Sequence, residues 1–82
     1  MRLTLYMRPG CHLCSDALEI LRRIGWQVDE MNIDEDRELW RRYTDRVPVV
    51  TLDGNEILSG AITEGQFRAA LAASRVAQPG NR

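Results

Sequence analysis

The chain has 82 residues, of which 44% are hydrophobic and 28% are charged, and its net charge is −1 at pH 7. This length and composition predict one globular domain, and the near-zero charge argues against a general nucleic-acid or membrane-surface binder. No apolar run approaches the roughly 20 residues that cross a bilayer, and the first residues are too strand-like for a signal peptide. We therefore expect a cytoplasmic monomer that binds neither nucleic acid nor membrane.

The first third of the chain predicts a strand, a helix and a second strand. Residues 2–7 are apolar, β-branched or aromatic, and Arg8-Pro9-Gly10 then breaks the strand. From Cys11 to Gly25 the apolar side chains recur at helical spacing, and a glycine fits the position after a helix end. The expected apolar face consists of Leu13, Ala17, Ile20, Leu21 and Ile24. Residues 26–33 are predicted as a second, parallel strand, with Trp26 and Val28 pointing inward and Met31 and Ile33 considered for the same face.

A short second helix is expected to follow. Asp34 is a good N-cap, and acidic residues in the first turn with arginines in the last complement the helix dipole. These charged residues are Glu35, Asp36, Arg41 and Arg42. Leu39, Trp40 and Tyr43 form a narrow apolar stripe, and we interpret Trp40 and Tyr43, like Trp26, as core residues.

The rest of the chain predicts a hairpin and a last helix. Residues 47–52 form a strand that opens with Pro48, and Asp53-Gly54 is a two-residue turn leading into residues 55–59. With this turn, Val50 would pair with Ile57, Val49 with Leu58, and Thr51 with Glu56 toward water. Thr63 to Gln66 matches a capping box, which predicts the start of the last helix.

The predicted order is β-α-β-α-β-β-α. It indicates an α/β domain with a four-stranded mixed sheet and helices on both faces. We place this domain at residues 1–74 and expect residues 75–82 to form a flexible tail.

Cys11 and Cys14 are the two cysteines of the chain, and a Cys-x-x-Cys pair has four common explanations. Haem attachment needs a histidine directly after the second cysteine, where Ser15 stands. A zinc site needs four ligands, so with only His12 between the cysteines it would need carboxylates or a second chain. Two structural thiols are disfavoured because the pair lies where a strand gives way to a helix. A dithiol redox centre fits best, and we predict no metal site.

The position of Cys11 at a helix start has a chemical consequence. Unpaired backbone N–H groups and the helix dipole stabilise an anion there, so we expect the pKa of the Cys11 thiol to lie below its usual ~8.5. Arg8 can add positive potential and is also a candidate substrate-binding residue. Cys11 would attack a substrate disulfide, and Cys14, one turn further in and more shielded, would resolve the adduct. His12 borders both sulfurs and could contact substrate, but we interpret it first as an ordinary first-turn residue.

Together these features resemble a glutaredoxin-like protein of the thioredoxin superfamily, from about Leu3 to Leu71. The motifs are Leu5-Tyr6 before Arg8-Pro9-Gly10-Cys11-His12-Leu13-Cys14, then Asn32-Ile33-Asp34, Arg46-Val47-Pro48-Val49-Val50 and residues 52–60. The resemblance implies that Cys11 is the nucleophile and Cys14 the resolving thiol. It also implies that Pro48 is a cis-proline facing them, which would present the Val47 backbone for strand-like pairing with a bound thiol peptide.

The resemblance also bears on the reductant. Typical glutaredoxins have Cys-Pro-Tyr-Cys and a Gly-Gly pair followed by acidic residues, whereas this chain has Ser59-Gly60-Ala61-Ile62-Thr63 at the second place. Gly60 and the Thr63 hydroxyl are therefore the groups that could serve a glutathione site. A Ser-Gly pair is similar to that of redoxins that thioredoxin reductase reduces and that supply ribonucleotide reductase. The resemblance implies an enzyme without a bound cofactor, acting on protein or small disulfides, with glutathione as co-substrate or thioredoxin reductase as reductant.

Two other functions stay open. A metal or iron–sulfur carrier would bind a cluster through Cys11 at a dimer interface, although Cys14 argues against it because most such glutaredoxins have one active-site cysteine. A binding module would keep the fold and dock partners along Val47-Pro48 without turnover.

Overall fold

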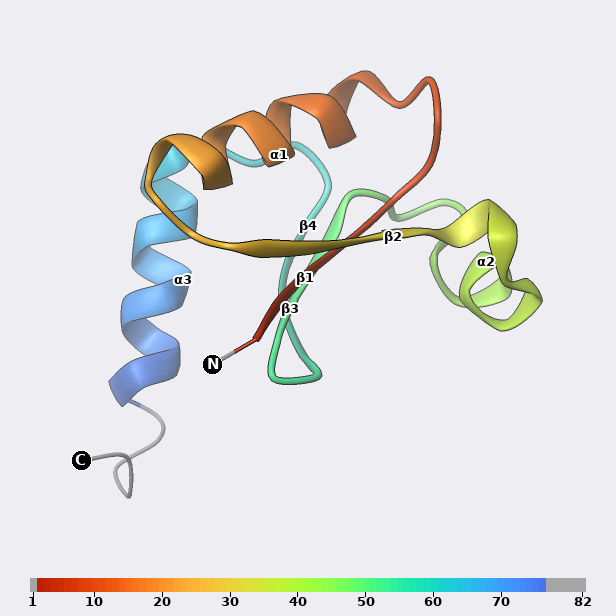
Figure 1. Cartoon of the computed structure of the whole chain (residues 1–82). Helices are drawn as coiled ribbons and strands as arrows, with labels where there is room; N and C mark the ends of the chain where they lie inside the picture. Colours follow the sequence, from red (N-terminus) through yellow and green to blue (C-terminus); the bar gives the residue numbers. More distant parts are fainter. Residues whose placement is uncertain (1, 77–82) are drawn as a thin grey trace.

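The structure is a computed structural model that describes residues 2–76 of the chain. The elements follow in the order β1 (Leu3–Met7), α1 (His12–Arg23), β2 (Val28–Asn32), η1 (Ile33–Glu35), α2 (Arg37–Tyr43), β3 (Val49–Leu52), β4 (Asn55–Ser59) and α3 (Glu64–Val76). The four strands form one sheet in the order β2-β1-β3-β4, with β1 parallel to β2 and every other pair antiparallel (Figure 1). The predicted α/β fold with a mixed sheet is confirmed.

The last helix extends further toward the C-terminus than the sequence suggested. We expected residues 75–82 to be a tail, but α3 continues to Val76, and residues 77–82 lie outside the described part of the chain. Within residues 2–76, no helix is both long and apolar enough to cross a membrane.

The larger core lies between the sheet and the helices α1 and α3. Its buried members are Leu3, Leu5, Ala17, Leu21, Val50, Leu52, Phe67 and Leu71. Leu13, which we expected on this face, is 43% exposed. The buried stripe of α1 instead runs through Cys14, Ala17 and Leu21. Because each helical residue turns by about 100°, Leu13 lies about 80° around the helix from Leu21 and points to the side.

A smaller cluster lies on the opposite face of the sheet under α2. It consists of Ile33, Tyr43 and Val49, with Tyr6, Leu39 and Val47 packed against them. Trp40, which we expected in the core, is 46% exposed, and Met31, which was considered for the inward face of its strand, is 43% exposed. The helix α2 has seven residues and turns only Leu39 and Tyr43 toward the sheet, while Met31 lies on the edge strand β2. The smaller cluster is therefore thin.

The starts and ends of the helices are set by local hydrogen bonds. The predicted end of α1 is confirmed, because Gly25 has a φ of +91° and its N–H donates to Arg22 O, while Trp26 N–H donates to Leu21 O. The predicted N-cap of the second helix is wrong. Asp36, not Asp34, caps α2 by accepting a hydrogen bond from Leu39 N at 3.0 Å. Asp34 belongs to η1, and this leaves its carboxylate free for another contact.

The hairpin forms at the expected turn but with a different register. Asp53 and Gly54 both have positive φ angles, +52° and +87°, as such a two-residue turn requires. Thr51 pairs with Glu56 as predicted, but a bulge then shifts the strands, so Val50 lies opposite Leu58 and Val49 opposite Ser59. Thr51 is 3% exposed and does not face water. The extra residue in the bulge is Ile57, and it lets both Ile57 and Leu58 pack against the larger core.

Candidate functional site

The two cysteines lie at the start of α1 and are joined by a disulfide. Their Cα atoms are 5.2 Å apart. Cys11 is the N-cap residue of α1 and is partly exposed, whereas Cys14 lies in the first turn and is 3% exposed. The sequence prediction that Cys14 is the more shielded of the two is confirmed. An incoming disulfide therefore reaches Cys11 more readily than Cys14.

One backbone N–H group of the first turn is directed at the Cys11 sulfur. Cys14 N–H donates to Cys11 Sγ at 3.1 Å, and Ser15 N–H donates to Cys11 O at 3.2 Å. The first turn of α1 carries no acidic residue. In the reduced protein the same N–H group would face a thiolate at the positive end of the helix dipole, where an anion is stabilised. The cap geometry thus fits the chemistry that the sequence suggested for Cys11.

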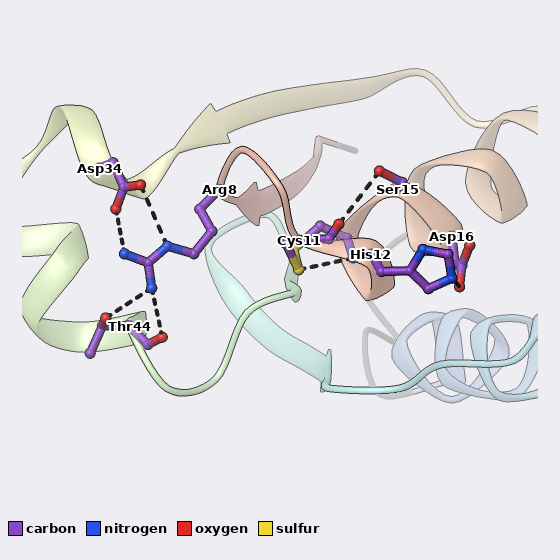
Figure 2. The surroundings of a disulfide bond; sticks show 8 residues. Arg8, Cys11, His12, Ser15, Asp16, Asp34 and Thr44 are labelled. Carbon is purple, nitrogen blue, oxygen red and sulfur yellow. Dashed lines mark hydrogen bonds and ion pairs between the residues drawn. A yellow bond between two sulfur atoms is a disulfide. The ribbon is translucent and has the colours of Figure 1, made fainter.

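Arg8 holds a position that the sequence did not suggest. Its guanidinium pairs with Asp34, with Nη2 2.7 Å from Oδ1, and also donates from Nη1 to Thr44 O at 3.2 Å and to Thr44 Oγ1 at 3.1 Å. Figure 2 shows this side chain extending away from the Cys11 sulfur. Because the adjacent Asp34 carboxylate partly offsets the guanidinium charge, Arg8 adds less positive potential at Cys11 than we expected.

His12 agrees with its interpretation as an ordinary first-turn residue. Its side chain is 90% exposed, and Nε2 lies 3.6 Å from the Asp16 carboxylate one turn further along the helix. The ring is turned along the helix toward Asp16 (Figure 2). Contact between His12 and a substrate stays a prediction.

The Val47–Pro48 segment lies at the same end of the sheet as the cysteines. In the antiparallel pair of β1 and β3, Tyr6 lies opposite Val49, so Pro48 stands beside the end of β1 that leads into the Cys11 loop. The Val47–Pro48 peptide bond is cis, as the resemblance implied. Val47 N–H already donates to Tyr43 O at 3.2 Å. Pairing of a substrate with Val47 would therefore use the Val47 carbonyl.

The two residues suggested for a glutathione site have structural contacts of their own. Gly60 N–H donates to Pro48 O at 2.9 Å, which places Gly60 at the same end of the sheet. Thr63 forms the predicted capping box of α3, because its Oγ1 accepts from Gln66 N at 3.2 Å and its N–H donates to Gln66 Oε1 at 2.9 Å. Their roles in ligand binding stay predictions, and for Thr63 the hydroxyl would have to bind a ligand while capping the helix.

Sequence reasoning gave no site role to three residues, namely Leu13 and the two partners of Arg8, Asp34 and Thr44. Asp34 and Thr44 are 26 and 36 residues from Arg8 in sequence. One available signal was the parallel pairing of β1 and β2, which sets Met7 beside Asn32 and therefore brings the two following segments together. Leu13 was assigned to the core, although it stands between the cysteines.

The described residues contain no ready-made metal centre. No group of three or more His, Cys, Asp or Glu side chains within residues 2–76 is placed to hold a metal ion. A metal or cluster bound at Cys11 would need ligands from another molecule, as the carrier hypothesis already assumed.

Comparison with known proteins adds a family and a fold. Residues 2–72 match the model of a family described as a glutaredoxin-like domain (DUF836). The chain is 38% identical to a structural-genomics target protein from X. campestris, with 87% of this chain and 96% of that one covered and a TM-score of 0.78. It is 31% identical to a protein from Nitrosomonas europaea, with 83% and 87% covered and a TM-score of 0.70. A buckwheat glutaredoxin–glutathione complex, 18% identical with 87% and 73% covered and a TM-score of 0.64, shows the fold alone. No curated protein matches the chain.

Proposed function

The chain belongs to the glutaredoxin-like domain family, and from that premise we propose that it is a thiol–disulfide oxidoreductase. Cys11 is the nucleophile and Cys14 the resolving thiol, and the substrates are protein or low-molecular-weight disulfides. The observation that carries the proposal is the cap geometry, in which Cys11 Sγ accepts the Cys14 N–H at the exposed start of α1.

The reaction has two exchange steps. In the reduced protein the Cys11 thiolate attacks one sulfur of the substrate disulfide, forms a mixed disulfide and expels the other sulfur as a thiolate, which takes up a proton. Cys14, as a thiolate, then attacks Cys11 Sγ and releases the second substrate thiol. Two electrons pass from the dithiol to the substrate, and the Cys11–Cys14 disulfide is the oxidised product. The 5.2 Å between the Cα atoms suits this closure.

The substrate would lie between the start of α1 and the Val47–Pro48 segment. Both parts lie at the same end of the sheet, and the Val47 carbonyl would serve as the backbone acceptor, because Val47 N–H already donates to Tyr43 O. Leu13, which stands between the two cysteines in the sequence and is 43% exposed, offers an apolar side chain for contact with such a substrate. These features favour a peptide or protein disulfide as substrate.

Two systems are candidates for the reductant of the Cys11–Cys14 disulfide. A buckwheat glutaredoxin of the same fold is known as a complex with glutathione, and Gly60 and Thr63 are the groups that we assign to a similar site. The Ser59-Gly60 pair favours instead reduction by thioredoxin reductase.

The test is turnover of a disulfide substrate with each reductant. We expect the wild-type protein to reduce a protein disulfide with glutathione and glutathione reductase, or with thioredoxin reductase, under NADPH. The variant Cys11→Ser should have no activity, because no other exposed thiol replaces it in the described residues. Absence of turnover with both systems would refute the proposed function. The control variant Glu19→Gln, at an exposed position of the same helix, should keep the activity.

A further inference from the structure

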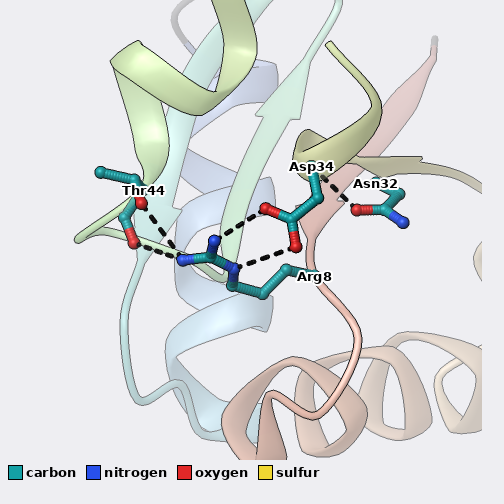
Figure 3. A network of polar contacts seen from close by, with 4 residues as sticks. All are labelled: Arg8, Asn32, Asp34 and Thr44. Carbon is teal, nitrogen blue, oxygen red and sulfur yellow. Dashed lines mark hydrogen bonds and ion pairs between the residues drawn. The ribbon is translucent and has the colours of Figure 1, made fainter. Parts of the chain in front are cut away.

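One arginine connects three segments that border the candidate site. The Arg8 guanidinium donates to Asp34 in η1 at 2.7 Å and 3.5 Å, and to the carbonyl and hydroxyl of Thr44 at 3.2 Å and 3.1 Å (Figure 3). Asp34 is itself held in place, because its N–H donates to Asn32 Oδ1 at 2.9 Å. The side chain thus joins the loop after β1, the turn after β2 and the end of α2.

Two of these segments continue directly into the parts that would act on a substrate. Arg8 O accepts a hydrogen bond from Cys11 N at 3.3 Å, so the same residue also supports the backbone of the nucleophile. Thr44 is the C-cap of α2, and the chain runs from it in three residues to Val47. Arg8 therefore spans the distance between the Cys11 loop and the segment that contains the cis Val47–Pro48 bond.

We propose that Arg8 is a positioning residue, which fixes Cys11 relative to the Val47–Pro48 segment so that a peptide disulfide is aligned for attack. The inference rests on the proposed exchange function and names the part of the site that selects peptide substrates. Arg8 acts through the placement of Cys11 and Val47, and its charge is directed at Asp34 rather than at the sulfur.

The geometry favours positioning over electrostatic activation. The ion pair is partly exposed, at 30% for Arg8 and 40% for Asp34, so its net contribution to stability is modest. A guanidinium with acceptors in fixed directions, however, restricts the orientation of all the groups that it binds. A lysine at this place would keep the charge but could not bind Asp34 and both Thr44 oxygens in the same way.

An electrostatic role and a positioning role of Arg8 predict different results for two variants, Arg8→Met and Asp34→Ala. If Arg8 activated Cys11 by its charge, Arg8→Met would raise the pH midpoint of Cys11 alkylation, and Asp34→Ala, which frees the arginine, would lower it. If Arg8 positions the site, both variants should leave this midpoint unchanged. Both variants should then raise KM for a ten-residue peptide disulfide by about fivefold, because a contact that aligns the peptide is lost.

The experiment measures three quantities on each variant, after circular dichroism has shown that it folds. They are the pH profile of Cys11 alkylation with iodoacetamide, KM and kcat for the peptide disulfide, and KM for 2-hydroxyethyl disulfide, which has no peptide backbone to align. We expect only the peptide KM to change. The double variant Arg8→Met/Asp34→Ala should be no worse than Arg8→Met alone, because Arg8→Met already removes the contact between Arg8 and Asp34.

Two further variants serve as controls. Arg8→Lys should raise KM for the peptide disulfide nearly as much as Arg8→Met does, although it keeps the positive charge. Arg22→Met, which removes a comparable surface ion pair between α1 and β2 (Arg22 to Glu30, 3.0 Å), should change none of the three quantities.

Two results would overturn the inference: shifts of the alkylation midpoint in opposite directions, or an unchanged peptide KM in both Arg8→Met and Asp34→Ala. A wild-type KM for the peptide disulfide in Arg8→Lys would also contradict the inference, because the positive charge alone would then be enough to align the peptide. A wild-type protein that exchanges no disulfide would refute the proposed function itself, and this result is distinguishable because it precedes any comparison of variants.

Discussion

The two faces of the sheet differ in how much material covers them. On one face, α1 and α3 bury eight residues of the larger core, while on the other the seven-residue α2 covers the smaller cluster of Ile33, Tyr43 and Val49. Figure 1 shows α3 and α2 at opposite ends of the molecule. The candidate site takes one part from each face. Cys11 begins a helix that is anchored in the larger core, and Val47 packs on the smaller cluster.

This difference indicates that chemistry and substrate alignment can be altered separately. Damage to the larger core should remove the fold and therefore all activity. Damage to the smaller cluster should weaken substrate binding while the thiol chemistry at Cys11 persists, because α1 is anchored in the larger core through Ala17 and Leu21. Four substitutions, in order of decreasing effect on stability, test this expectation.

The largest effect is expected at Phe67 in the larger core. Its side chain is fully buried, so Phe67→Ala should cost about 3–5 kcal/mol of unfolding free energy, which is a large part of the stability of a small domain. Urea denaturation followed by circular dichroism measures this loss. Phe67→Leu is the matched control and should cost much less. A loss below about 1 kcal/mol for the alanine variant would show that the larger core is not the main support of the fold.

Substitution of Tyr43 in the smaller cluster should lower the unfolding free energy by less than substitution of Phe67. The residue is 6% exposed, and its ring centroid lies 4.8 Å from that of Tyr6. We expect Tyr43→Ala to lower the unfolding free energy by about 2–3 kcal/mol and Tyr43→Phe, which keeps the ring contact, by under about 1 kcal/mol. Tyr43→Ala should also raise KM for a peptide disulfide without changing the rate of Cys11 alkylation. If Tyr43→Ala impaired the peptide KM and the rate of Cys11 alkylation equally, substrate alignment and thiol chemistry would not depend on separate faces of the sheet.

Asp36 tests the attachment of α2 itself. Because it caps the helix through Leu39 N, Asp36→Ala should lower the unfolding free energy by about 1 kcal/mol, and Asp36→Asn, also a good cap, by much less. Thermal unfolding compares the two variants. If Asp34 were the cap, as the sequence suggested, Asp34→Ala rather than Asp36→Ala would show the helix-capping loss.

Leu13 should have the smallest effect on stability. Its side chain is 43% exposed and belongs to neither cluster, so Leu13→Ser should change the unfolding free energy by no more than about 0.5 kcal/mol. We expect it to lower kcat/KM for an apolar peptide disulfide by about fivefold, through loss of an apolar contact. Activity toward 2-hydroxyethyl disulfide should stay within about twofold, and an equal loss on both substrates would argue against a contact role.

Most of the features that depend only on neighbouring residues were predicted from the sequence, with the N-cap of α2 as the exception. The helix end at Gly25, the turn at Asp53-Gly54 and the capping box at Thr63 were all confirmed, because each is determined within a few residues. The helix-start position of Cys11 was found for the same reason.

The parts that depend on distant segments were not predicted. The pairing of Arg8 with Asp34 requires the register of β1 and β2, and the bulge at Ile57 depends on packing against the larger core. The exposure of Trp40 follows from how little of the sheet α2 covers, and that of Met31 from the edge position of β2. None of these facts is encoded in local periodicity.

The most direct test of the account is to trap the intermediate of the exchange. A Cys14→Ser variant is incubated with a peptide disulfide, and the adduct is identified by intact mass and peptide mapping. We expect one mixed disulfide, on Cys11, that a thiol reductant reverses, whereas Cys11→Ser should form none because Cys14 is 3% exposed. Adduct formation on Cys14 at a comparable rate, or no adduct on Cys11, would contradict the assignment of Cys11 as the nucleophile.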